Sequence, residues 1–427
     1  ACPCILQARA GRKSCATNAH RPESGAAMAG TKGVSRRGFV GGAATALGAL
    51  ALKSPAQLWA ESRRVAEAPG FLPPPALPLD EYDSYAKISF NENPYGPPES
   101  VLKAMNTAFK YANRYNYPDG GIVDAIAKYH NVKREYVLLG AGSGELLDVM
   151  GSAYSQNGKK VIGASPSYEF VYSHVSSVRG DSLTVPLLPD YRQDIPGIVR
   201  ATNMHYRDVG FVYLCNPNNP TGRIVTKAEI KQLMDGIPQD VPVLIDEAYY
   251  HFVDNSEYGT SVPYVLEGRP VLVTRTFSKI AALAGMRLGY GIANPEMIKQ
   301  LEPYISDSIS AVVKWGGVAA LDDGDSQAKV KKITLDLRKK TTTELESLGY
   351  SVIPSETNFF MVGLKRPVKP VVDEFKKRGV LVGRPFPPMM EHLRVSVGSA
   401  DEMSRFIVAF KDIMSKPVAA AASSGGN

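Results

Sequence analysis

The sequence predicts an α/β fold, with a large domain built on a central, mostly parallel sheet and a smaller α+β domain toward the carboxyl end. Short apolar segments such as 241–245 have the composition of strands that are buried on both faces of a parallel sheet. Several of these segments run into turns rich in Gly, Pro or Asn, and open α/β sheets bind ligands at that edge. After about residue 300 the pattern changes to a charged amphipathic helix over 330–348, followed by short strands and helices.

Length and charge limit the classes of function. The 427 residues leave room for two domains, and 44% hydrophobic and 21% charged residues are ordinary for a globular protein. The whole chain has 49 basic and 42 acidic residues, of which residues 1–60 carry eight and one, so the remainder carries 41 of each. Because the body is neutral, we expect no nucleic-acid-binding surface.

Cysteine positions exclude a disulfide framework in the body of the chain. Cys2, Cys4 and Cys15 lie near the amino end, and Cys215 is the remaining cysteine. No cysteine spacing typical of a metal site is present, so we expect no metal. Cys215 follows the apolar segment 209–214, which predicts a small buried hydrophobic residue and not a nucleophile.

Residues 1–60 have the pattern of an export leader. Arg36 and Arg37 precede a Gly- and Ala-rich apolar run over 41–52, which is too short for a relaxed membrane span. This resembles a twin-arginine signal, with Met28 as a candidate start and cleavage after Ala60. The resemblance implies passage of the folded protein through the twin-arginine translocase to a periplasmic or otherwise exported location. An ordinary basic leader is the alternative, and an unused leader would leave the protein cytoplasmic.

Composition also sets the expected domain boundaries. Residues 61–84 are rich in proline and predict a linker. We expect an amino-terminal arm and the large domain over 85–300, the small domain over 301–415, and a disordered Ala- and Ser-rich tail over 416–427.

Lys279 lies among small and hydroxyl-bearing residues. A lysine that forms a Schiff base needs a partly desolvated pocket and cationic neighbours that lower its pKa. The small residues around Lys279 let a flat ligand approach the backbone, and Thr276, Ser278 and Arg287 are residue types that bind phosphate. The alternative is a surface lysine that precedes an Ala-rich helix.

A glycine-rich turn follows the apolar strand expected at 136–139. Ala141, Gly142 and Ser143 lie in this turn, directly before a helix that begins near Glu145. Free N–H groups at the start of a helix point toward an anion, and glycine lets the anion approach closely. The turn therefore predicts a phosphate site, although such turns also cap helices.

Polar side chains follow three more of the predicted strands. Tyr168 follows the strand expected at 161–164, and Asn219 lies in a turn that two prolines make rigid. Asp246 ends a fully apolar strand, where a carboxylate is costly unless a cation pairs with it. Tyr249 follows three residues later. The carboxyl ends of parallel strands meet at one edge, so we expect these side chains to lie close together.

These segments together resemble the fold-type I pyridoxal-phosphate aminotransferases of class I/II, and the histidinol-phosphate aminotransferases among them. The resemblance covers roughly residues 85–415. The matching motifs are N-E-N-P-Y-G-P at 91–97, Y-P-D-G at 117–120, N-P-x-N-P-T-G at 216–222, S-K-x-x-x-L-A-G-x-R-x-G-Y at 278–290 and L-R-V-S-V-G at 393–398.

The resemblance implies a pyridoxal 5'-phosphate enzyme that moves an amino group between an L-amino acid, or a histidinol-phosphate-like amine, and a 2-oxo acid. It implies that Lys279 holds the cofactor and moves the substrate proton, and that Asp246 pairs with the ring nitrogen. Arg394 would bind the substrate carboxylate. The other cofactor contacts that it implies are Ala141, Gly142, Ser143, Tyr168, Asn219, Tyr249, Thr276, Ser278, Arg287 and Tyr117. The other substrate contacts are Asn219, Tyr95 and Asn93.

The resemblance also implies a homodimer in which Tyr117 reaches the cofactor phosphate of the partner subunit. The chain departs from the family pattern at Asn116, where arginine is usual, and at Gly383. At position 383, directly after the apolar run, histidinol-phosphate aminotransferases commonly have an arginine that binds the substrate phosphate. In this chain the arginine, Arg384, comes one residue later. A one-residue slip in a strand reverses the facing of the side chain, so the sequence does not predict recognition of a substrate phosphate at this position.

Two alternatives remain at this point. A racemase, an oxidase or a lyase would use the same anchoring residues. A cofactor-binding transcription regulator would need a DNA-binding domain before residue 85, and the leader and linker leave no room for one.

Overall fold

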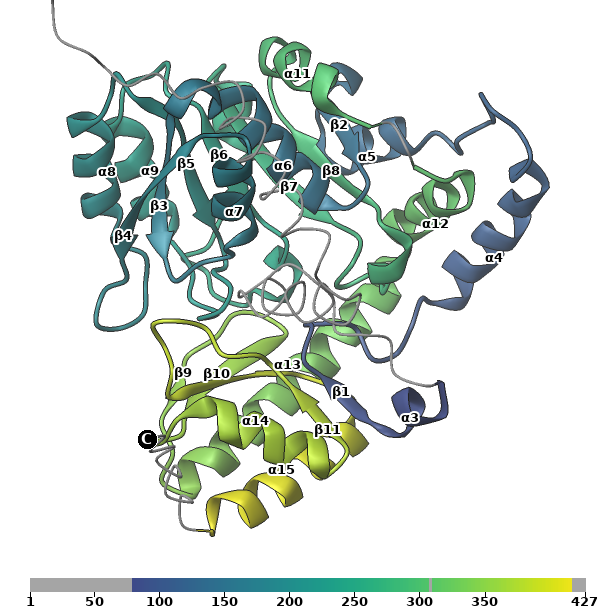
Figure 1. The fold of residues 1–427 in the computed structure, drawn as a ribbon. Helices are drawn as coiled ribbons and strands as arrows, with labels where there is room; N and C mark the ends of the chain where they lie inside the picture. Colours follow the sequence, from purple (N-terminus) through teal and green to yellow (C-terminus); the bar gives the residue numbers. More distant parts are fainter. Residues whose placement is uncertain (1–78, 307–308, 417–427) are drawn as a thin grey trace, which may run out of the picture. The chain divides into compact units, whose positions relative to one another are not determined.

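The computed structural model describes residues 79–306 and 309–416 (Figure 1). The predicted leader, most of the predicted linker and the predicted tail after Lys416 lie outside the described residues. The last six residues of the range expected to be a linker form a short helix, α3 (Leu79–Ser84). None of the helices in the two described ranges combines the length and the hydropathy that crossing a membrane requires.

A seven-stranded sheet forms the centre of the large domain, in the order β2-β8-β7-β6-β5-β3-β4. Strand β8 is antiparallel to both of its neighbours, and every other neighbouring pair is parallel. This confirms the mostly parallel sheet predicted from the sequence. The strands are β2 (Val137–Gly140), β3 (Lys160–Ser165), β4 (Asp181–Pro186), β5 (Val209–Cys215), β6 (Val243–Asp246), β7 (Val271–Thr276) and β8 (Gly289–Ile292).

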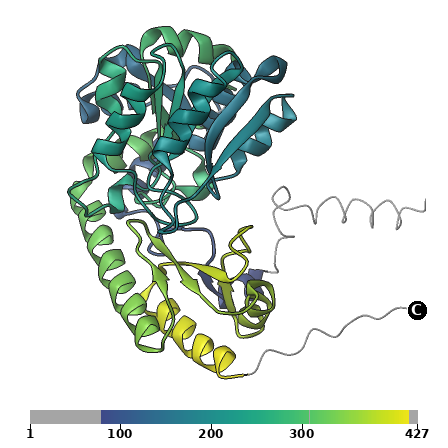
Figure 2. The same ribbon diagram turned by 90° about the vertical axis from the view of Figure 1, so that its left-hand side faces the viewer.

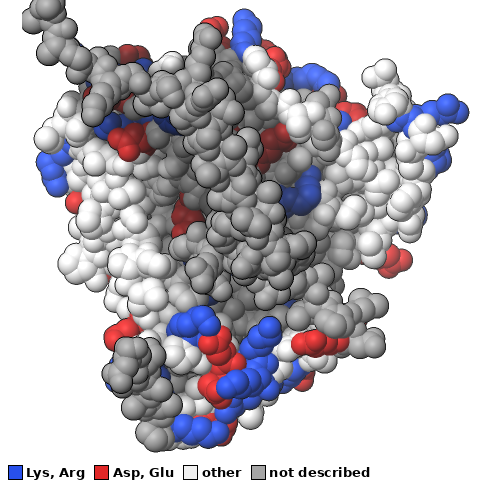
Figure 3. Space-filling view, in the orientation of Figure 1, with Lys and Arg blue, Asp and Glu red and all other residues white. Residues whose placement is uncertain are grey.

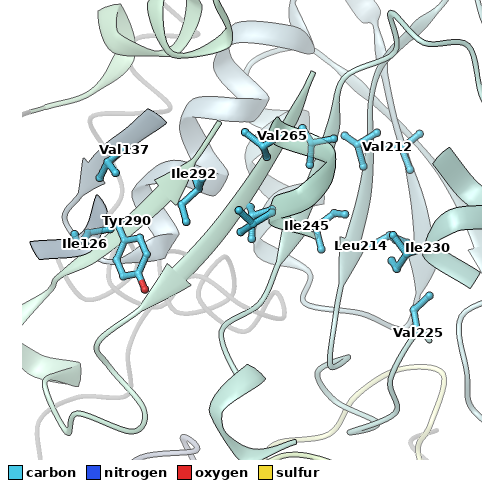
Figure 4. Packing of buried hydrophobic residues seen from close by; sticks show 14 of the residues in the cluster. Ile126, Val137, Val212, Leu214, Val225, Ile230, Ile245, Val265, Tyr290 and Ile292 are labelled. Carbon is cyan, nitrogen blue, oxygen red and sulfur yellow. The ribbon is translucent and has the colours of Figure 1, made fainter. Parts of the chain in front are cut away.

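Helices cover both faces of this sheet, which is why its central strands are apolar throughout. In β5, Val212 and Leu214 pack on one face (Figure 4), and Phe211, Tyr213 and the buried Cys215 pack on the other. The first face is covered by α4 (Glu99–Ala108), α5 (Ile122–His130), α8 (Ile195–Met204), α9 (Lys227–Gly236), α10 (Val262–Leu266) and α12 (Ala311–Asp322). The second face is covered by α6 (Ser143–Tyr154), α7 (Phe170–Ser177) and α11 (Pro295–Leu301).

The small domain is α+β, as predicted. Strands β12, β10 and β9 form an antiparallel sheet, and β1 pairs in parallel with β11. The long helix α13 connects the two domains, as Figure 2 shows. The elements are β1 (Ala86–Ile88), α13 (Gly324–Ser347), β9 (Val352–Ile353), β10 (Phe359–Gly363), α14 (Val368–Lys377), β11 (Val380–Val382), β12 (His392–Ser396) and α15 (Ala400–Met414).

The two cores do not divide at residue 300, where the sequence placed the boundary. Val313 and Ala320 of α12 belong to the core of the large domain, so that core extends further along the chain. The arm strand β1, which the sequence placed with the large domain, contributes Ala86 and Ile88 to the core of the small one. A short strand is stable only when it is paired, and its partner here is β11.

A buried ion pair lies beneath the carboxyl edge of the large sheet. Arg275 Nη2 lies 2.6 Å from Glu247 Oε2, and the two side chains are 3% and 0% exposed. Ser261 N and Thr260 Oγ1 also donate to Glu247, and the Arg275 guanidinium lies 3.6 Å from the centroid of the Tyr250 ring. The surrounding donors and the opposite charge offset the cost of removing both groups from water.

We expect Glu247→Gln to lower the free energy of unfolding by about 3–5 kcal/mol, because it leaves the buried Arg275 charge without its partner. The matched control is Lys369→Met, which breaks the Lys369–Asp373 pair. That pair lies in the small domain, where acidic and basic side chains lie beside one another at the surface (Figure 3). The control should change stability by less than about 0.5 kcal/mol. Urea unfolding measures both, and equal losses would contradict the prediction.

Candidate active site

The predicted site residues gather at one edge of the seven-stranded sheet. Strands β5, β6 and β7 are parallel and end at or just before Asn219, Asp246 and Lys279, respectively. Strands β2 and β3 end just before Gly142 and Tyr168. The carboxyl edge of an open α/β sheet is where such folds bind ligands. Five segments that are far apart in the sequence therefore contribute to a single site.

The predicted phosphate residues form a cradle at the start of α6. Gly142 has φ +80°, and a β-carbon there would lie 2.2 Å from Nη2 of Arg287, so the guanidinium touches the turn. The residue of β8 that pairs with Thr276 is a glycine, and a β-carbon there would lie 2.2 Å from the first backbone nitrogen of α6. Thr276 Oγ1 donates to Ser278 Oγ at 2.8 Å. A helix start, a guanidinium and two hydroxyls are a donor set that suits a phosphate.

Glu145 is part of this turn and was not predicted from the sequence. Its Oε2 accepts a hydrogen bond from Ala141 N at 2.6 Å, and its Oε1 accepts one from Ser306 N at 2.8 Å. Ala141, which the sequence placed among the phosphate contacts, therefore has its N–H bonded to a side chain of the protein. An acid in the first turn of a helix is a common capping residue, and its position three residues after the N-cap is the signal that could have identified it.

Asp246 is buried at the end of β6 and accepts only neutral hydrogen bonds within the described residues. Thr274 Oγ1 and Ala248 N donate to its Oδ1 at 3.1 and 3.2 Å, and the side chain is 3% exposed. Burial raises the pKa of Asp246 to about 6, and the nearby Lys279 acts in the opposite direction. A cationic donor would therefore stabilise the ionised carboxylate.

Lys279 is mostly buried, and its Nζ donates to the backbone oxygen of Phe90 at 3.0 Å. Burial, together with the positive charges of Arg394 and Arg287, lowers the pKa of Lys279 to about 8, while Glu92 and Asp246 oppose this shift. These are the surroundings that a lysine needs to form a Schiff base. Near pH 8 about half of the amine is neutral and nucleophilic.

Arg394 is buried beside Lys279, on β12 of the small domain. Its Nη1 donates to Asn219 Oδ1 at 2.8 Å and its Nη2 to Ser89 O at 2.6 Å, while its buried Nε has no partner within the described residues. Burial lowers the pKa of Arg394 to about 10. Asn219 Nδ2 in turn donates to the hydroxyl of Tyr249 at 3.4 Å. Asn219 and Tyr249 thus lie together, as the sequence predicted.

Three predicted contacts have other neighbours in the monomer. Tyr168 stacks on Phe170, with ring centroids 5.1 Å apart. The hydroxyl of Tyr117 donates to the backbone oxygen of Ile309 in the same chain. Tyr95 is 44% exposed at the edge of the site. The proposed contact of Tyr117 with a partner subunit stays a prediction.

Comparison with known proteins assigns the family. The profile of "Aminotransferase class I and II" matches residues 84–410. The chain belongs to the class I and II aminotransferase family. Histidinol-phosphate aminotransferase of Moorella thermoacetica is 32% identical over 80% of this chain and 90% of its own length. Histidinol-phosphate aminotransferase 2 of Carboxydothermus hydrogenoformans is 33% identical over 80% of this chain and 96% of its own.

Solved structures show the same fold. A protein from Erwinia carotovora atroseptica matches with a TM-score of 0.74 at 30% identity, covering 78% of this chain and 96% of that one. Histidinol-phosphate aminotransferase from Sinorhizobium meliloti, in complex with pyridoxal-5'-phosphate, matches with a TM-score of 0.73 at 24% identity. The alignment covers 82% of this chain and 99% of that structure. This aminotransferase therefore has the fold-type I architecture predicted from its motifs.

The residues of this aminotransferase fit pyridoxal phosphate. Asp246 is a buried carboxylate with no cationic hydrogen-bond donor in the described chain, and the ring nitrogen can supply one. Gly142 and Arg287 form a cradle that a β-carbon would obstruct. Arg394 keeps a buried Nε–H without an acceptor among the described residues, which a substrate carboxylate can provide. Each of these features is costly in an isolated protein and is relieved by a ligand of this kind.

The amino-terminal arm supplies contacts that were not predicted from the sequence. Ser89 O, Phe90 O and the side chain of Asn91 bond, respectively, to Arg394, Lys279 and Tyr249. The sequence analysis selected Asn93 instead, whose Nδ2 donates to the backbone oxygen of the residue after Lys279 at 2.9 Å. The signal that could have identified Asn91 is its place at the start of the N-E-N-P-Y-G-P motif, three residues after β1 ends.

The structure places Arg384 close to Arg394, the predicted substrate-binding arginine. Strand β11 ends two residues earlier, so the alternation of facing does not extend to Arg384. The guanidinium carbons of Arg384 and Arg394 lie 4.4 and 4.6 Å from the centroid of the Phe386 ring, so they are at most about 9 Å apart. Gly383 is constrained, because a β-carbon there would lie 2.7 Å from Arg394 O. Arg384 forms an ion pair with Glu169 of the large domain.

We expect Gly142→Ala to weaken the binding of pyridoxal phosphate by at least about tenfold, because the new methyl group displaces Arg287 and strains a left-handed backbone. Gly158→Ala is the matched control, since Gly158 has φ +77° and a methyl group added there would have no atom within 4 Å. Equilibrium titration of the apoprotein with the cofactor measures both affinities. Equal losses in the two variants would show that the backbone, and not the cradle, is responsible.

Proposed function

We propose that this chain is a pyridoxal-phosphate-dependent aminotransferase that moves an amino group between an amino acid, or a histidinol-phosphate-like amine, and a 2-oxo acid. The family assignment gives the reaction class. The observation that carries the mechanism is the group of charges at the carboxyl edge of the sheet: the partly buried Lys279 and the buried Asp246 and Arg394. When bound, pyridoxal phosphate supplies an aldehyde that condenses with amines and a cationic ring that withdraws electrons from the substrate.

Lys279 is the residue that anchors the cofactor and moves the proton. Because its pKa is lowered to about 8, its amine can be neutral near physiological pH and can take a proton from the substrate Cα. The same nitrogen can return that proton to the cofactor carbon that carries the substrate nitrogen. Small side chains around it leave the approach to the backbone open.

Asp246 and Arg394 set the electronics and the orientation. The Asp246 carboxylate stabilises a protonated ring nitrogen, because the buried anion has no other cationic hydrogen-bond donor in the described chain. Arg394 binds the substrate carboxylate and thereby fixes which Cα bond stands perpendicular to the ring. Racemases, oxidases and lyases that use this cofactor would need the same anchoring groups. The family match favours transamination over them.

The assembly and the location that we propose rest on the sequence and on exposed side chains. Phe109 and Tyr115 are 60% and 98% exposed close to Tyr117, which suits a surface that a second copy covers. We infer a homodimer in which Tyr117 contacts the partner's site. The arginine pair Arg36–Arg37 supports export through the twin-arginine route, which would carry the enzyme folded and loaded with its cofactor.

We expect Lys279→Ala to lower turnover by at least about 10³-fold, because the variant lacks both the covalent anchor and the proton carrier. The variant should still bind the cofactor noncovalently through Asp246 and the phosphate cradle. Lys365→Ala is the control, since Lys365 bonds Gly349 O at the surface of the small domain. Turnover assays and borohydride trapping of the cofactor measure the two effects. Undiminished turnover in the Lys279 variant would overturn the assignment.

We expect amino acid donors to react faster than histidinol phosphate with 2-oxoglutarate as the acceptor. Histidinol phosphate has no carboxylate for Arg394, and Arg384, which shares the Phe386 ring with Arg394, is already paired with Glu169. Initial rates over aromatic, basic and acidic donors measure this order. Glu169→Gln should raise the relative rate with histidinol phosphate, because it frees the Arg384 guanidinium. A wild-type preference for histidinol phosphate would contradict the prediction.

A further inference from the structure

The hydroxyl of Tyr249 faces two side-chain amides inside the protein. Asn91 Nδ2 lies 3.0 Å and Asn219 Nδ2 lies 3.4 Å from the hydroxyl oxygen, and the tyrosine side chain is 4% exposed. The orientation of Asn219 follows from Arg394, whose Nη1 contacts the amide oxygen at 2.8 Å. A guanidinium only donates hydrogen bonds, so the oxygen of Asn219 must face it and the nitrogen must face Tyr249.

Asn91 is oriented by Ser396 in the same way. The hydroxyl of Ser396 donates to Asn91 Oδ1 at 2.8 Å and accepts from Asn91 N at 2.8 Å. The first of these bonds uses the amide oxygen, which leaves the amide nitrogen to face Tyr249. Asn358 Nδ2 also donates to Asn91 O at 3.0 Å. The residue is 1% exposed and has φ +55°, a left-handed conformation that asparagine tolerates.

The two amides determine what Tyr249 can do. A phenol oxygen accepts two hydrogen bonds and donates one, so with both acceptor positions filled its proton must go to a third group. Within the described residues no atom accepts that proton. Burial raises the pKa of Tyr249, so the hydroxyl keeps its proton. Lys279 Nζ lies 5.8 Å from the centroid of the same ring, which places the tyrosine ring beside the lysine that anchors the cofactor.

We propose that Asn91 is a positioning residue of this enzyme: it commits Tyr249 to donate its hydrogen bond to the phenolic oxygen of the bound cofactor. The inference rests on the proposed function, because it requires pyridoxal phosphate at Lys279. A donor at that oxygen stabilises its negative charge. It therefore lowers the pH at which the lysine–cofactor linkage loses its proton.

The neighbours of Asn91 connect this role to the arm. Ser89 O accepts from Arg394 and Phe90 O accepts from Lys279, so three successive residues contact the three side chains that bind cofactor and substrate. The arm must be seated on the small domain for all three contacts to form. The packing of the arm on the small domain and the proton affinity of the bond between Lys279 and the cofactor are therefore coupled.

Asn91→Gly is the sharpest test. Glycine adopts φ +55° without strain and retains the backbone bonds to Ser396 and Asn358, so the variant loses only the amide. Absorbance of the purified holoenzyme, recorded against pH, gives the midpoint of the chromophore's colour change. We expect this midpoint to rise by about 0.5–1 pH unit, the effect of losing one buried hydrogen bond. Asn131→Gly is the matched control, since Asn131 has φ +51° at the exposed end of α5, and its midpoint should not move.

A second variant tests whether the effect passes through Tyr249. Tyr249→Phe should raise the midpoint at least as much as Asn91→Gly, and combining the two should add less than about 0.2 unit. Asn91→Asp, which keeps the shape but can only accept, should also raise the midpoint if Asn91→Gly does not fold. An unchanged midpoint in a folded Asn91 variant, or a full additional shift in the Tyr249→Phe background, would overturn the proposal. A wild-type protein that binds no cofactor would instead contradict the proposed function.

Discussion

Three charged groups, of which two are buried and Lys279 is partly buried, lie at the carboxyl edge of the large sheet, and none of them has an ion-pair partner within the described residues. Asp246, Lys279 and Arg394 come from β6, from the turn after β7 and from β12. Burial moves each pKa toward the neutral form, to about 6, 8 and 10, respectively. Unpaired charges in this state lower the stability of the fold. A protein that bound no ligand there would not retain them. The ligand that relieves all three must carry a cation, a carbonyl and an anion, which describes the cofactor and its substrate together.

The ends of strands β6 and β7, which carry Asp246 and lead to Lys279, are stabilised by a buried ion pair. Asp246 faces the site, whereas the next residue, Glu247, turns away and pairs with Arg275 of β7. That pair is nearly inaccessible to water and is surrounded by further donors. One end of β6 thus carries an unpaired carboxylate toward the ligand and a fully paired one into the protein. We infer that the second carboxylate keeps the strand end fixed, so that the first can remain in an unfavourable position.

The small domain and the arm close the site on its other side. Arg394 donates to Asn219 of the large domain, and the arm offers backbone oxygens to Arg394 and to Lys279. Substrate binding at Arg394 would compete with these contacts, because the same guanidinium holds Asn219 and Ser89 O. Binding of a carboxylate and rearrangement of the arm are therefore linked by shared hydrogen bonds. Such sharing gives an enzyme a means to sense its substrate before reaction.

Motifs within short stretches of the chain were sufficient for the sheet class, the lysine, the carboxylate and the arginine. Apolar strands followed by polar turns are local patterns, and the carboxyl edge of a parallel sheet collects whatever follows each strand. The facing of Arg384 could not be derived from the one-residue slip, because alternation holds only within a strand and β11 ends before that residue. The domain assignment of α12 and of β1 also depended on contacts with residues far away in the sequence.

The sequence by itself determined the fold class, the family and the residues that carry charge at the site. It did so because each of these depends on residue types at fixed local spacing. Only the tertiary structure decided that Asn91 bonds Tyr249, that Glu145 occupies the Ala141 N–H, and that Glu169 pairs with Arg384. Hydrogen bonds between segments hundreds of residues apart depend on distance and direction in space, and a linear pattern of residues contains neither.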